Sequence, residues 1–504
     1  MTQHPVLVVG AGPVGLTMAL ALRRRGVAVR IVDRAPAPTD KSKALVIWAR
    51  TLELLDIEGC ADVFVAAGLK VEAACILEDH GRELIRIPFA AVRSAYNFAL
   101  MLPQSETERL LAAQLAALGT TVERQVELLS FAQREGGIRA QLRGPDGTEQ
   151  AFECAWLVAC DGAHSTVRHA LGVEFEGETE PSDFLLADVA IDGNLSTDRI
   201  SICWAPDGIL ALFPMAGGRF RVIADCGPAA AGEAPEEPTL DEVQRLVDDR
   251  GPAGQRLHSP VWLSHFRINE RKVREYRHGR VFLAGDAAHV HSPAGGQGMN
   301  TGMQDALNLA WKLALVWHGR AAPVLLDSYS PERSAIGDQV LRNAGTMTRM
   351  ALLRNPLLQE IRRLAVGSLG RIPALRQHMV DQLSETDLHY PHSPLTQARH
   401  GASCHPAPGE RAPDIGLQHD TGAAGAGRLH EALAGGRFVL LAVEAAPVAL
   451  PDALTSIAVS VQAAAAAGYH PGYIYLVRPD AYVAACAADG DPEALLALLR
   501  SLAP

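Results

Sequence analysis

The chain has 504 residues, of which 48% are hydrophobic and 20% are charged, and its formal net charge is −11 at pH 7. This length predicts about three domains with a sizeable core, and the negative charge argues against nucleic acid as a partner because no basic field offsets phosphate repulsion. No apolar run reaches about 18 residues and no signal-peptide pattern opens the chain, so we expect a cytoplasmic protein with no membrane segment.

The first predicted element is a strand, residues 6–9, that leads through a glycine-rich turn into a helix. The turn contains three glycines and a proline, namely Gly10, Gly12, Pro13 and Gly15. The first glycine permits the turn, the second lets the backbone approach a pyrophosphate, and the third lets the helix pack against the strand. The amides and positive dipole end of such a helix attract phosphate. The pattern predicts a dinucleotide site, the alternative being a glycine-rich turn that binds nothing.

A second strand, residues 27–32, ends at Asp33 and Arg34. An acid at this position is expected to accept hydrogen bonds from the ribose hydroxyls of an adenosine. Beyond a turn, Lys43 precedes a helix that has Ile47 on its apolar face and Arg50 near its start. These cations could neutralise phosphate charge, and an exposed helix start that carries ordinary cations is an equally good explanation.

Short strand-like segments follow at 71–99 and suggest a sheet that leaves the nucleotide domain. Gln104 then opens a helical run, and two further strand-like segments lie between 126 and 142. The next apolar strand ends at Asp161, which is followed by a glycine and a helix start. An Asp-Gly pair after a strand is usually only a turn.

Residues 173–266 have the pattern of a mostly antiparallel sheet that is interrupted by one helix, 243–249. Such a sheet would form a second layer over the nucleotide domain and roof a ligand pocket. Three aromatic side chains could face that pocket or lie in the core: Trp204, Phe213 and Phe220. No residue in this region identifies itself as a catalytic base.

The α/β pattern returns with a buried strand, residues 281–284, which delivers Asp286 to its carboxyl end. A glycine-rich loop, Pro293–Gly298, then leads to a long helix that ends near Trp317. Because open α/β sheets bind ligands at the carboxyl ends of their strands, Asp286 and this loop should meet the same molecule as the first glycine motif. Asp286 could instead be a helix N-cap. Three separated glycine and aspartate sites, at Gly10–Gly15, Asp161 and Asp286, together imply a cofactor longer than NAD.

Two histidines, His289 and His291, lie next to this third site. Their spacing suggests a metal site, but no carboxylate or cysteine completes a ligand set. We therefore expect no metal.

Together these segments resemble the three fingerprints of the group A FAD-dependent monooxygenases, the single-component aromatic hydroxylases. The resemblance covers about residues 5–345. It implies an α/β fold, with a Rossmann-like FAD-binding domain and an inserted β-rich substrate domain, and FAD that is not covalently attached. The first motif would hold the pyrophosphate, Asp161 would help to bind FAD and NADPH, and Asp286 would bind the ribityl chain.

The resemblance implies further FAD contacts for a basic residue, a glutamine and the loop beside the flavin ring: Lys43, Gln104, Pro293, Gly298, Met299 and Asn300. Lysine at position 43 departs from the commoner arginine. Lys43 would meet a phosphate as a point charge, which does not replace the planar fork of arginine.

In that family NADPH or NADH reduces FAD, O2 adds to the reduced flavin as a C4a-hydroperoxide, and an electron-rich substrate takes the distal oxygen. The resemblance therefore implies hydroxylation of a small aromatic substrate, phenolic or polyketide-like. The sequence has no second GxGxxG for NADPH, as expected where that nucleotide binds transiently. The alternatives are Baeyer–Villiger-type insertion, flavin-dependent reduction, and a protein that holds FAD or an aromatic ligand without turnover.

After a helical stretch, 338–383, and a linker rich in proline, histidine and glycine, the segment from about 405 resembles the thioredoxin-like C-terminal domain of phenol and polyketide hydroxylases. It has no CxxC, so we expect a structural role or a contact in a homodimer instead of redox work. The eight cysteines show no metal-ligand spacing and are interpreted as reduced core residues, with Cys404 and Cys486 as bystanders.

The predicted domain divisions follow from these patterns. They are 1–174 and 271–395 for the FAD-binding domain, 175–270 for the substrate domain, with 71–100 added to its sheet, and 396–504 for the C-terminal domain.

Overall fold

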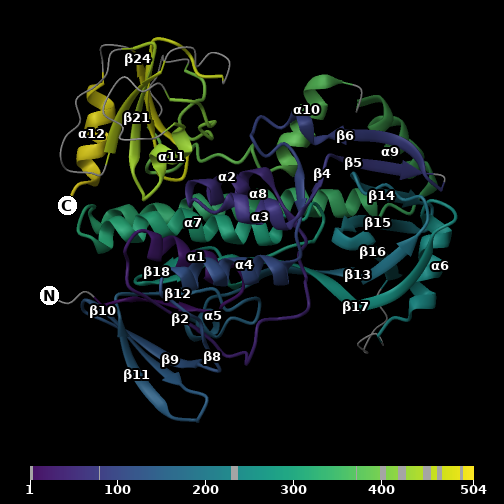
Figure 1. The fold of residues 1–504 in the computed structure, drawn as a ribbon, viewed down its shortest axis with the longest axis horizontal. Coiled ribbons are helices and arrows are strands. Elements are labelled where there is room, and N and C mark those ends of the chain that lie inside the picture. Colours follow the sequence, from purple (N-terminus) through teal and green to yellow (C-terminus); the bar gives the residue numbers. More distant parts are fainter. Residues whose placement is uncertain are drawn as a thin grey trace.

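The computed structural model of the chain describes residues 4–78, 80–228, 237–369, 372–397, 404–417, 427–445, 456–461, 468–488 and 492–504. Figure 1 shows three regions around one long central helix, α7 (Gly298–Trp317). A sheet with its helices lies on one side of α7, a large second sheet lies at one end, and a small C-terminal domain lies on the other side.

The first sheet has the strand order β18-β19-β12-β1-β2-β8. In that order the strands are Arg277–His278, Val281–Leu283, Trp156–Ala159, Val6–Val9, Val29–Asp33 and Glu123–Arg124. The strands from β19 to β8 pair in parallel, so their carboxyl ends meet at one edge. Strands β1, β12 and β19 are buried along their whole length, which explains their uninterrupted apolar sequences.

Helix α1 (Pro13–Arg24) follows β1 directly and packs against both α7 and α4 (Gln104–Ala117). The short helices α3 (Ala61–Ala67) and α5 (Thr166–Ala170) belong to the same region. This arrangement places the N-terminal ends of α1 and α7 near the edge where the parallel strands end.

Two small sheets flank this region. One is antiparallel, in the order β11-β10-β9, and the other has the order β3-β7-β4. Their strands are Glu149–Cys154, Gly137–Arg143 and Glu127–Arg134, and Val46–Ile47, Ala99–Met101 and Leu69–Val71. The prediction that Ile47 lies on a helix is wrong. Ile47 belongs to β3 and pairs with Leu100 of β7, and the helix α2 begins only at Ala49 and ends at Ile57.

The large sheet has eight strands in the order β20-β17-β13-β16-β15-β14-β5-β6. They are His289–Val290, Arg256–Lys272, Glu176–Asp192, Arg219–Pro228, Gly208–Met215, Arg199–Ala205, Ala73–Glu78 and Arg82–Pro88. One face is covered by α6 (Leu240–Arg250), whose Val243 and Val247 pack on Leu210. The other face turns half-buried side chains, Phe213 among them, toward the core of the first region. The predicted β-rich layer with one helix is confirmed.

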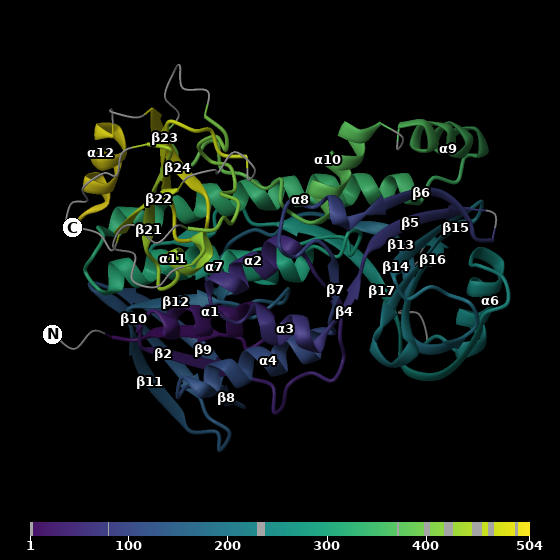
Figure 2. The same cartoon turned by 45° about the horizontal axis from the view of Figure 1, so that its top comes forward.

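Three further helices follow α7: α8 (Tyr329–Ala351), α9 (Pro356–Leu369) and α10 (Pro373–Leu383). Figure 2 shows α8 running beside α7, with α9 and α10 above the large sheet. The guanidinium of Arg362 on α9 lies 4.0 Å from the ring centre of Trp204. Trp204 is therefore covered by α9, and Phe220 is buried in the core.

The C-terminal domain contains a four-stranded sheet in the order β22-β21-β23-β24. The strands are Ser456–Val461, Phe438–Val443, Tyr473–Val477 and Val483–Ala488, and the helices are α11 (Leu429–Leu433) and α12 (Glu493–Leu502). Strands β21 and β22 are parallel and the other pairs are antiparallel. With the Rossmann-like first sheet and the inserted β-rich layer, this thioredoxin-like domain confirms the predicted α/β fold class.

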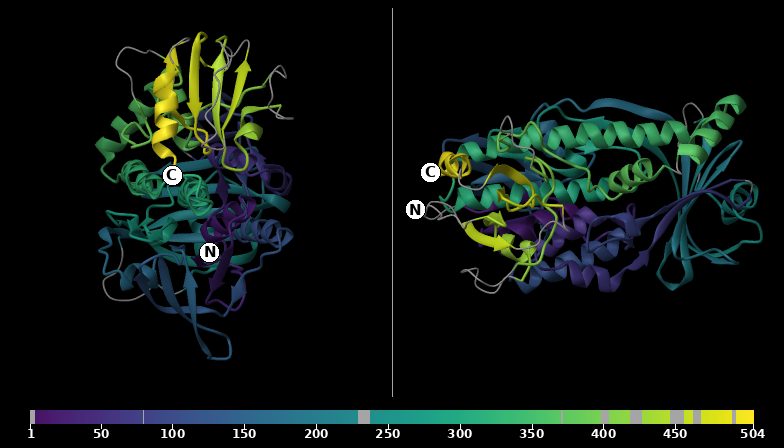
Figure 3. Two further views of the ribbon diagram at one scale, coloured as in Figure 1. Left: turned by 90° about the vertical axis from the view of Figure 1, so that its left-hand side faces the viewer. Right: turned by 90° about the horizontal axis from the view of Figure 1, so that it is seen from above.

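A buried ionic network joins the C-terminal domain to the rest of the chain. Arg478 donates to both oxygens of Glu332 on α8, at 2.7 and 2.9 Å, and to both oxygens of Asp480, at 3.0 and 2.7 Å. Lys312 on α7 donates to Glu332 at 2.6 Å. Arg478, Lys312 and Glu332 have no solvent exposure, so each depends on its partners for charge compensation. Figure 3 shows the domain seated along α7 and α8.

Arg50 belongs to this interface, which overturns both sequence interpretations of it. Its side chain is fully buried, donates to the carbonyl oxygen of Asp480 at 2.6 Å and pairs with Glu53 at 3.1 Å. It is neither an exposed cation nor a free charge that awaits a phosphate. The partner that fixes it lies 430 residues away in the sequence, which no local pattern reveals.

The interpretation of the cysteines also needs correction. Cys404 and Cys486 form a disulfide across 82 residues of sequence, so they are not reduced bystanders. They meet because the segment after Cys404 runs along β24, where the Gly409 N–H donates to the Val483 carbonyl and the Val483 N–H donates to the Glu410 carbonyl. Of the free thiols, Cys226 is exposed and not a core residue.

None of the helices among the described residues combines the length and the apolar character needed to cross a lipid bilayer.

Candidate cofactor site

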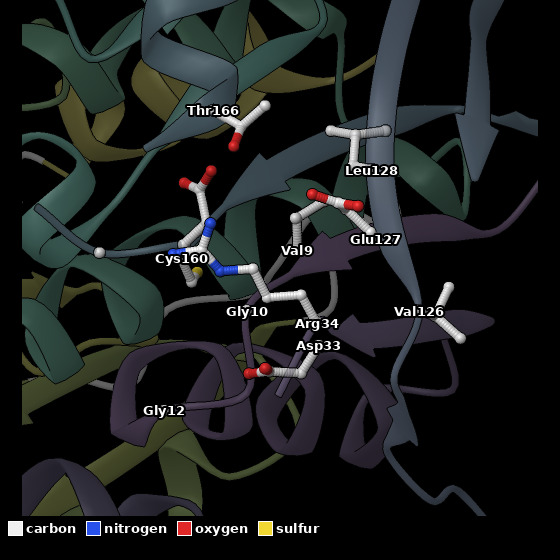
Figure 4. Close-up of a pocket in the computed structure, with 12 residues that line it drawn as sticks. Val9, Gly10, Gly12, Asp33, Arg34, Val126, Glu127, Leu128, Cys160 and Thr166 are labelled. Atoms are coloured by element: carbon white, nitrogen blue, oxygen red, sulfur yellow. The ribbon is translucent and has the colours of Figure 1, made fainter. Parts of the chain in front are cut away.

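A cavity of about 230 Å³ opens where the parallel strands end. Its walls come from the ends of β1, β2 and β12, the start of β9 and the start of α5: Val9, Gly10, Gly12, Asp33, Arg34, Val126, Glu127, Leu128, Cys160, Asp161, Gly162 and Thr166. Figure 4 shows these side chains around one hollow. The structure thus brings the first glycine motif together with Asp33, Arg34 and Asp161.

The three motif glycines differ in what surrounds them. A Cβ on Gly10, which has φ +98°, would lie 2.2 Å from the carbonyl oxygen of Cys160, and one on Gly15 would lie 1.9 Å from that of Gly10. These two glycines are required by backbone packing. A Cβ on Gly12 would instead enter open space, 4.0 Å from Glu108 Oε1. This opening at the N-terminal end of α1 is the shape that a pyrophosphate needs, so the chain fits a dinucleotide here.

Asp33 is held in place by backbone amides. Its Oδ2 accepts a hydrogen bond from the N–H of Ala11 at 2.7 Å, and its Oδ1 accepts one from Ala35 at 2.8 Å. Arg124 lies 3.5 Å from Oδ2. Each carboxylate oxygen retains a lone pair for a further donor. Arg34, the next residue, is exposed at the cavity.

Asp161 carries a buried oxygen that has no hydrogen-bond partner among the residues that the structure describes. Its Oδ2 accepts from the N–H of Val167 at 3.2 Å, whereas Oδ1 has no hydrogen bond. Burial raises the pKa of this carboxyl, and hydrogen bonds from Ser165 and Val167 oppose the shift. A buried acceptor without a donor is costly, so this oxygen suits a ligand hydroxyl or amide in the same cavity.

Gln104 opens α4, which packs against α1, and Lys43 lies on the segment before β3. Gln104 Oε1 accepts from the N–H of Ala44 at 3.3 Å, and Gln104 Nε2 donates to Glu108 at 2.9 Å. Burial raises the pKa of Glu108. Lys43 is exposed, and its carbonyl oxygen accepts from Arg221 in the large sheet at 3.1 Å. Gln104 thus joins α4 to the segment before β3, and the Lys43 backbone joins that segment to the large sheet.

Asp286 lies in a single helical turn, Gly285–Ala287, after β19. Its side chain reaches solvent. Partial desolvation by the surrounding protein raises the pKa of the Asp286 carboxyl, and the charges of His289 and Lys43 oppose this shift. The N-cap of the turn is Ala284, with no side-chain cap. The alternative that made Asp286 the cap is therefore wrong.

The loop before α7 is anchored from the side of β3. The Asn300 side chain accepts from the N–H of Trp48 at 2.9 Å and donates to the carbonyl oxygens of Val46, at 2.9 Å, and Gly296, at 3.0 Å. Trp48 Nε1 donates to the carbonyl oxygen of Gly295 at 2.8 Å. The Asn300 side chain is thus occupied in fixing the loop.

The first bond within α7 joins the Thr301 N–H to the Gln297 carbonyl at 2.8 Å. The N–H groups of Gly298, Met299 and Asn300 precede that bond and are the orphan donors of the helix start. Pro293, at the start of the loop, is exposed. The loop therefore offers backbone donors to an oxygen or ring nitrogen of a ligand.

Glu385, just after α10, is buried against α7 and gives a pH-dependent prediction. It accepts from Gln304 at 2.5 Å and Thr301 at 3.2 Å, and burial raises its pKa from 4.5 to about 8. The folded state therefore binds a proton that the unfolded state releases, and stability falls as pH rises through the window from 4.5 to about 8.

We expect Glu385→Gln, which imitates the protonated acid, to raise the free energy of unfolding at about pH 9 and to change it little at about pH 4. Urea denaturation at the two pH values measures the difference. An equal effect at both would show that the charge of Glu385 is not the cause.

Sequence reasoning missed part of the cavity wall. Val126 and Leu128 are apolar residues at the start of a predicted strand, and Glu127, Cys160 and Thr166 had no motif to mark them. The strand pattern predicted that Val126 and Leu128 would be buried. It did not identify the surface that they would contact. Their place opposite β2 depends on the parallel pairing of β2 with β8.

Two family models match the chain. The FAD binding domain model covers residues 3–344, and the model described as aromatic-ring hydroxylase, C-terminal, covers residues 405–503. The chain is 41% identical over 399 residues to 6-methylpretetramide 4-monooxygenase of Streptomyces rimosus, which covers 78% of this chain and 71% of that enzyme. It is also 33% identical to the 12-dehydrotetracycline 5-monooxygenase/anhydrotetracycline 6-monooxygenase of Streptomyces rimosus, over 98% of both chains.

Among solved structures, the chain resembles the OxyS anhydrotetracycline hydroxylase from Streptomyces rimosus, with a TM-score of 0.79, 30% identity and 99% of both chains covered. It also resembles CabE, an aromatic hydroxylase from angucycline biosynthesis, with a TM-score of 0.79, 29% identity and full coverage of both chains.

The fold and the glycine cavity define a dinucleotide-binding protein, and the family model over residues 3–344 specifies the dinucleotide as FAD. The chain belongs to the family of FAD-dependent aromatic-ring monooxygenases. It is a flavoprotein enzyme that hydroxylates aromatic compounds with electrons from NAD(P)H, as the resemblance of the three sequence motifs implied.

Proposed function

We propose that this enzyme uses O2 to hydroxylate a polycyclic, phenolic substrate of the polyketide type. The observation that carries the proposal is the likeness over nearly the whole chain to enzymes that are named for tetracycline intermediates. The large sheet also turns half-buried apolar side chains, Ile202, Phe213 and Met215, toward the first region. Such a surface suits the face of an aromatic ring system.

The proposed contacts with FAD follow the molecule from its adenosine end. Gly10, Gly12, Pro13 and Gly15 would admit the pyrophosphate, and Asp33, Arg34 and Asp161 would bind the ribose and its surroundings. Lys43, Gln104 and Asp286 would hold the phosphate and ribityl portions, and the loop residues Pro293, Gly298, Met299 and Asn300 would lie beside the ring. The unpartnered oxygen of Asp161 and the open space at Gly12 support these assignments.

FAD supplies the redox chemistry, because accepting electrons from NAD(P)H and activating dioxygen are beyond amino-acid side chains. The chain's own part is to hold and orient the cofactor and to keep water away from the reacting atoms. The orphan amides of Gly298 and Met299 would donate hydrogen bonds where the ring carries negative charge.

The proposed substrate class can be tested by NAD(P)H oxidation and O2 uptake with simple phenols and with tetracyclic polyketides. We expect polyketides to stimulate both rates together, with a product one oxygen heavier. A reductase would oxidise NAD(P)H without O2, and a binding protein would consume neither. Stimulation by simple phenols alone would contradict the proposal. Structure determination of the product distinguishes ring hydroxylation from Baeyer–Villiger insertion.

The role of Asp286 gives a separate prediction. If its carboxylate binds ribityl hydroxyls, Asp286→Ala removes a charge-assisted hydrogen bond of about 1.5–3 kcal/mol, and FAD affinity should fall by about ten- to a hundredfold. Because the side chain caps no helix in the protein, the melting temperature of the apoprotein should stay unchanged. Flavin fluorescence titration and thermal melts measure the two effects. Unchanged affinity would remove Asp286 from the site.

We further propose that the enzyme works in the cytoplasm, where NADPH is available, and that it forms a homodimer. Sedimentation of the intact protein tests the dimer. A count of reactive thiols in freshly lysed cells tests whether the Cys404–Cys486 disulfide exists in that compartment.

The four domain divisions given from the sequence remain our proposal for the boundaries.

A further inference from the structure

Asp305, on α7, is a buried carboxylate with two contacts in the third motif, Gly285 and His289, and one on α8, Arg333. Its Oδ2 accepts from the N–H of Gly285 at 3.0 Å and lies 2.8 Å from His289 Nε2. Its Oδ1 accepts from Arg333 Nε at 2.6 Å. Asp305 has no solvent exposure. Both of its oxygens are therefore engaged, and one of them holds the backbone directly before Asp286.

The turn that Asp305 holds is closely packed on its other sides. Gly285 has φ +59°, and a Cβ on it would lie 2.7 Å from Val14 Cγ2 on α1. A Cβ on Gly302 of α7 would lie 3.1 Å from the Gly285 Cα. The backbone of Gly285 is thus confined by α1 on one side and α7 on the other. The hydrogen bond that the Gly285 N–H donates to Asp305 is the polar contact that fixes the direction of this N–H.

Arg333 on α8 fixes Asp305 in turn. Its guanidinium is fully buried and donates to Asp305, to the Tyr390 hydroxyl at 2.8 Å and to the carbonyl oxygen of Thr301 at 3.0 Å. Burial opposes ionisation of Asp305, but the charges of Arg333 and His289 prevail and hold its pKa below the usual value. A charged acceptor therefore faces the Gly285 N–H.

Arg333 also connects the turn with the C-terminal domain. The Tyr390 ring lies 4.4 Å from that of Tyr482, and the guanidinium of Arg478 lies 5.2 Å from the Tyr390 ring centre. A continuous series of buried contacts thus runs from the C-terminal domain through Arg333 and Asp305 to Gly285.

We propose that Asp305 is the positioning residue of the flavin site: by holding the Gly285 N–H it sets the Asp286 carboxylate against the ribityl chain, with Arg333 as its counter-ion. The proposal rests on FAD binding at this edge and on the proposed role of Asp286. Asp305 itself touches neither cofactor nor substrate.

The test replaces Asp305 with Asn. An amide has one acceptor oxygen, which the guanidinium of Arg333 will attract, so its NH2 group then faces the Gly285 N–H as a second donor. We expect FAD affinity to fall by about tenfold or more. The visible circular dichroism of the residual bound flavin should change, and more hydrogen peroxide should form per NADPH consumed.

Glu332→Gln is the matched control, because Glu332 is equally buried and paired with Arg478 and Lys312 but does not contact the third motif. Both variants should melt at lower temperature. Only Asp305→Asn should weaken FAD and alter its dichroism. The proposal would be overturned if Asp305→Asn and Glu332→Gln lost the same stability and bound FAD with the same affinity.

A second variant covers the case in which Asp305→Asn does not fold. Arg333→Lys keeps a cation near Asp305 but loses the planar fork that fixes the carboxylate. We expect an FAD affinity about threefold weaker than that of the wild type, with a changed dichroism spectrum. Wild-type affinity together with a wild-type spectrum would contradict the positioning role. If Asp286→Ala leaves FAD affinity unchanged while Asp305→Asn lowers it, the proposed role of Asp286 fails and that of Asp305 in ordering the turn remains.

Discussion

Gly12→Ala should give a folded protein that binds FAD at least about a hundredfold more weakly than the wild type. Gly12 has φ −76° and ψ −173°, which alanine adopts without strain, and the added Cβ would have no neighbour closer than Glu108 Oε1 at 4.0 Å. The apoprotein should therefore melt as the wild type does. The methyl group would occupy the space that a pyrophosphate needs to reach the first amides of α1.

Flavin fluorescence titration of the apoprotein measures this effect, with thermal melts of the same samples. Gly416→Ala is the matched control, because Gly416 also has open space for a Cβ but lies in the C-terminal domain. That variant should bind FAD normally. A Gly12→Ala protein with wild-type affinity would place the pyrophosphate elsewhere.

The second large effect concerns the interface of the C-terminal domain. Arg478→Ala leaves Glu332 and Asp480 buried without their cation, and Lys312 compensates only one of the two acids. Loss of one partner from a buried ion pair costs about 3–5 kcal/mol, so we expect a loss of this size in the free energy of unfolding. The effect should appear as one cooperative transition that includes release of FAD.

Chemical denaturation followed by flavin fluorescence measures this loss. Arg500→Ala is the control within the same domain, because Arg500 pairs with Glu493 at the surface, where both side chains are more than half exposed. An exposed pair contributes about 0–1 kcal/mol. If the two variants were equally stable, the buried network would not hold the domain in place.

The parts of the fold and site that could be predicted share one property, namely that their signal is local. The run from Val6 to Gly15 and the segment from Val281 to Asp286 each contain the strand, the turn and the polar residue at its end. Parallel strands bring such ends to one edge, and Asp33 and Asp161 do line one cavity, while the assignment of Asp286 to the same ligand stays a prediction.

The charged residues that hold the third motif and the domain interface have no such signal. Arg50, Asp305 and Arg333 lie on helices, where a buried charge and a solvated one look alike in sequence. Their partners lie up to 430 residues away. The same limit applies to Cys404 and Cys486, which meet only because a loop runs along β24. Contacts of this kind form when the domains pack against one another. The sequence pattern of each domain alone therefore does not reveal them.

The buried network also sets the order in which the chain can reach its native state during synthesis. Asn308 and Glu332 leave the ribosome before Asp480 and Arg478, their partners in the C-terminal domain, have been made. At about 5–20 residues per second, roughly 150 residues of delay correspond to about 10–30 seconds. Until then the faces of α7 and α8 that the C-terminal domain covers remain in water, so a nascent chain that lacks its last 30 residues should be a substrate for chaperones.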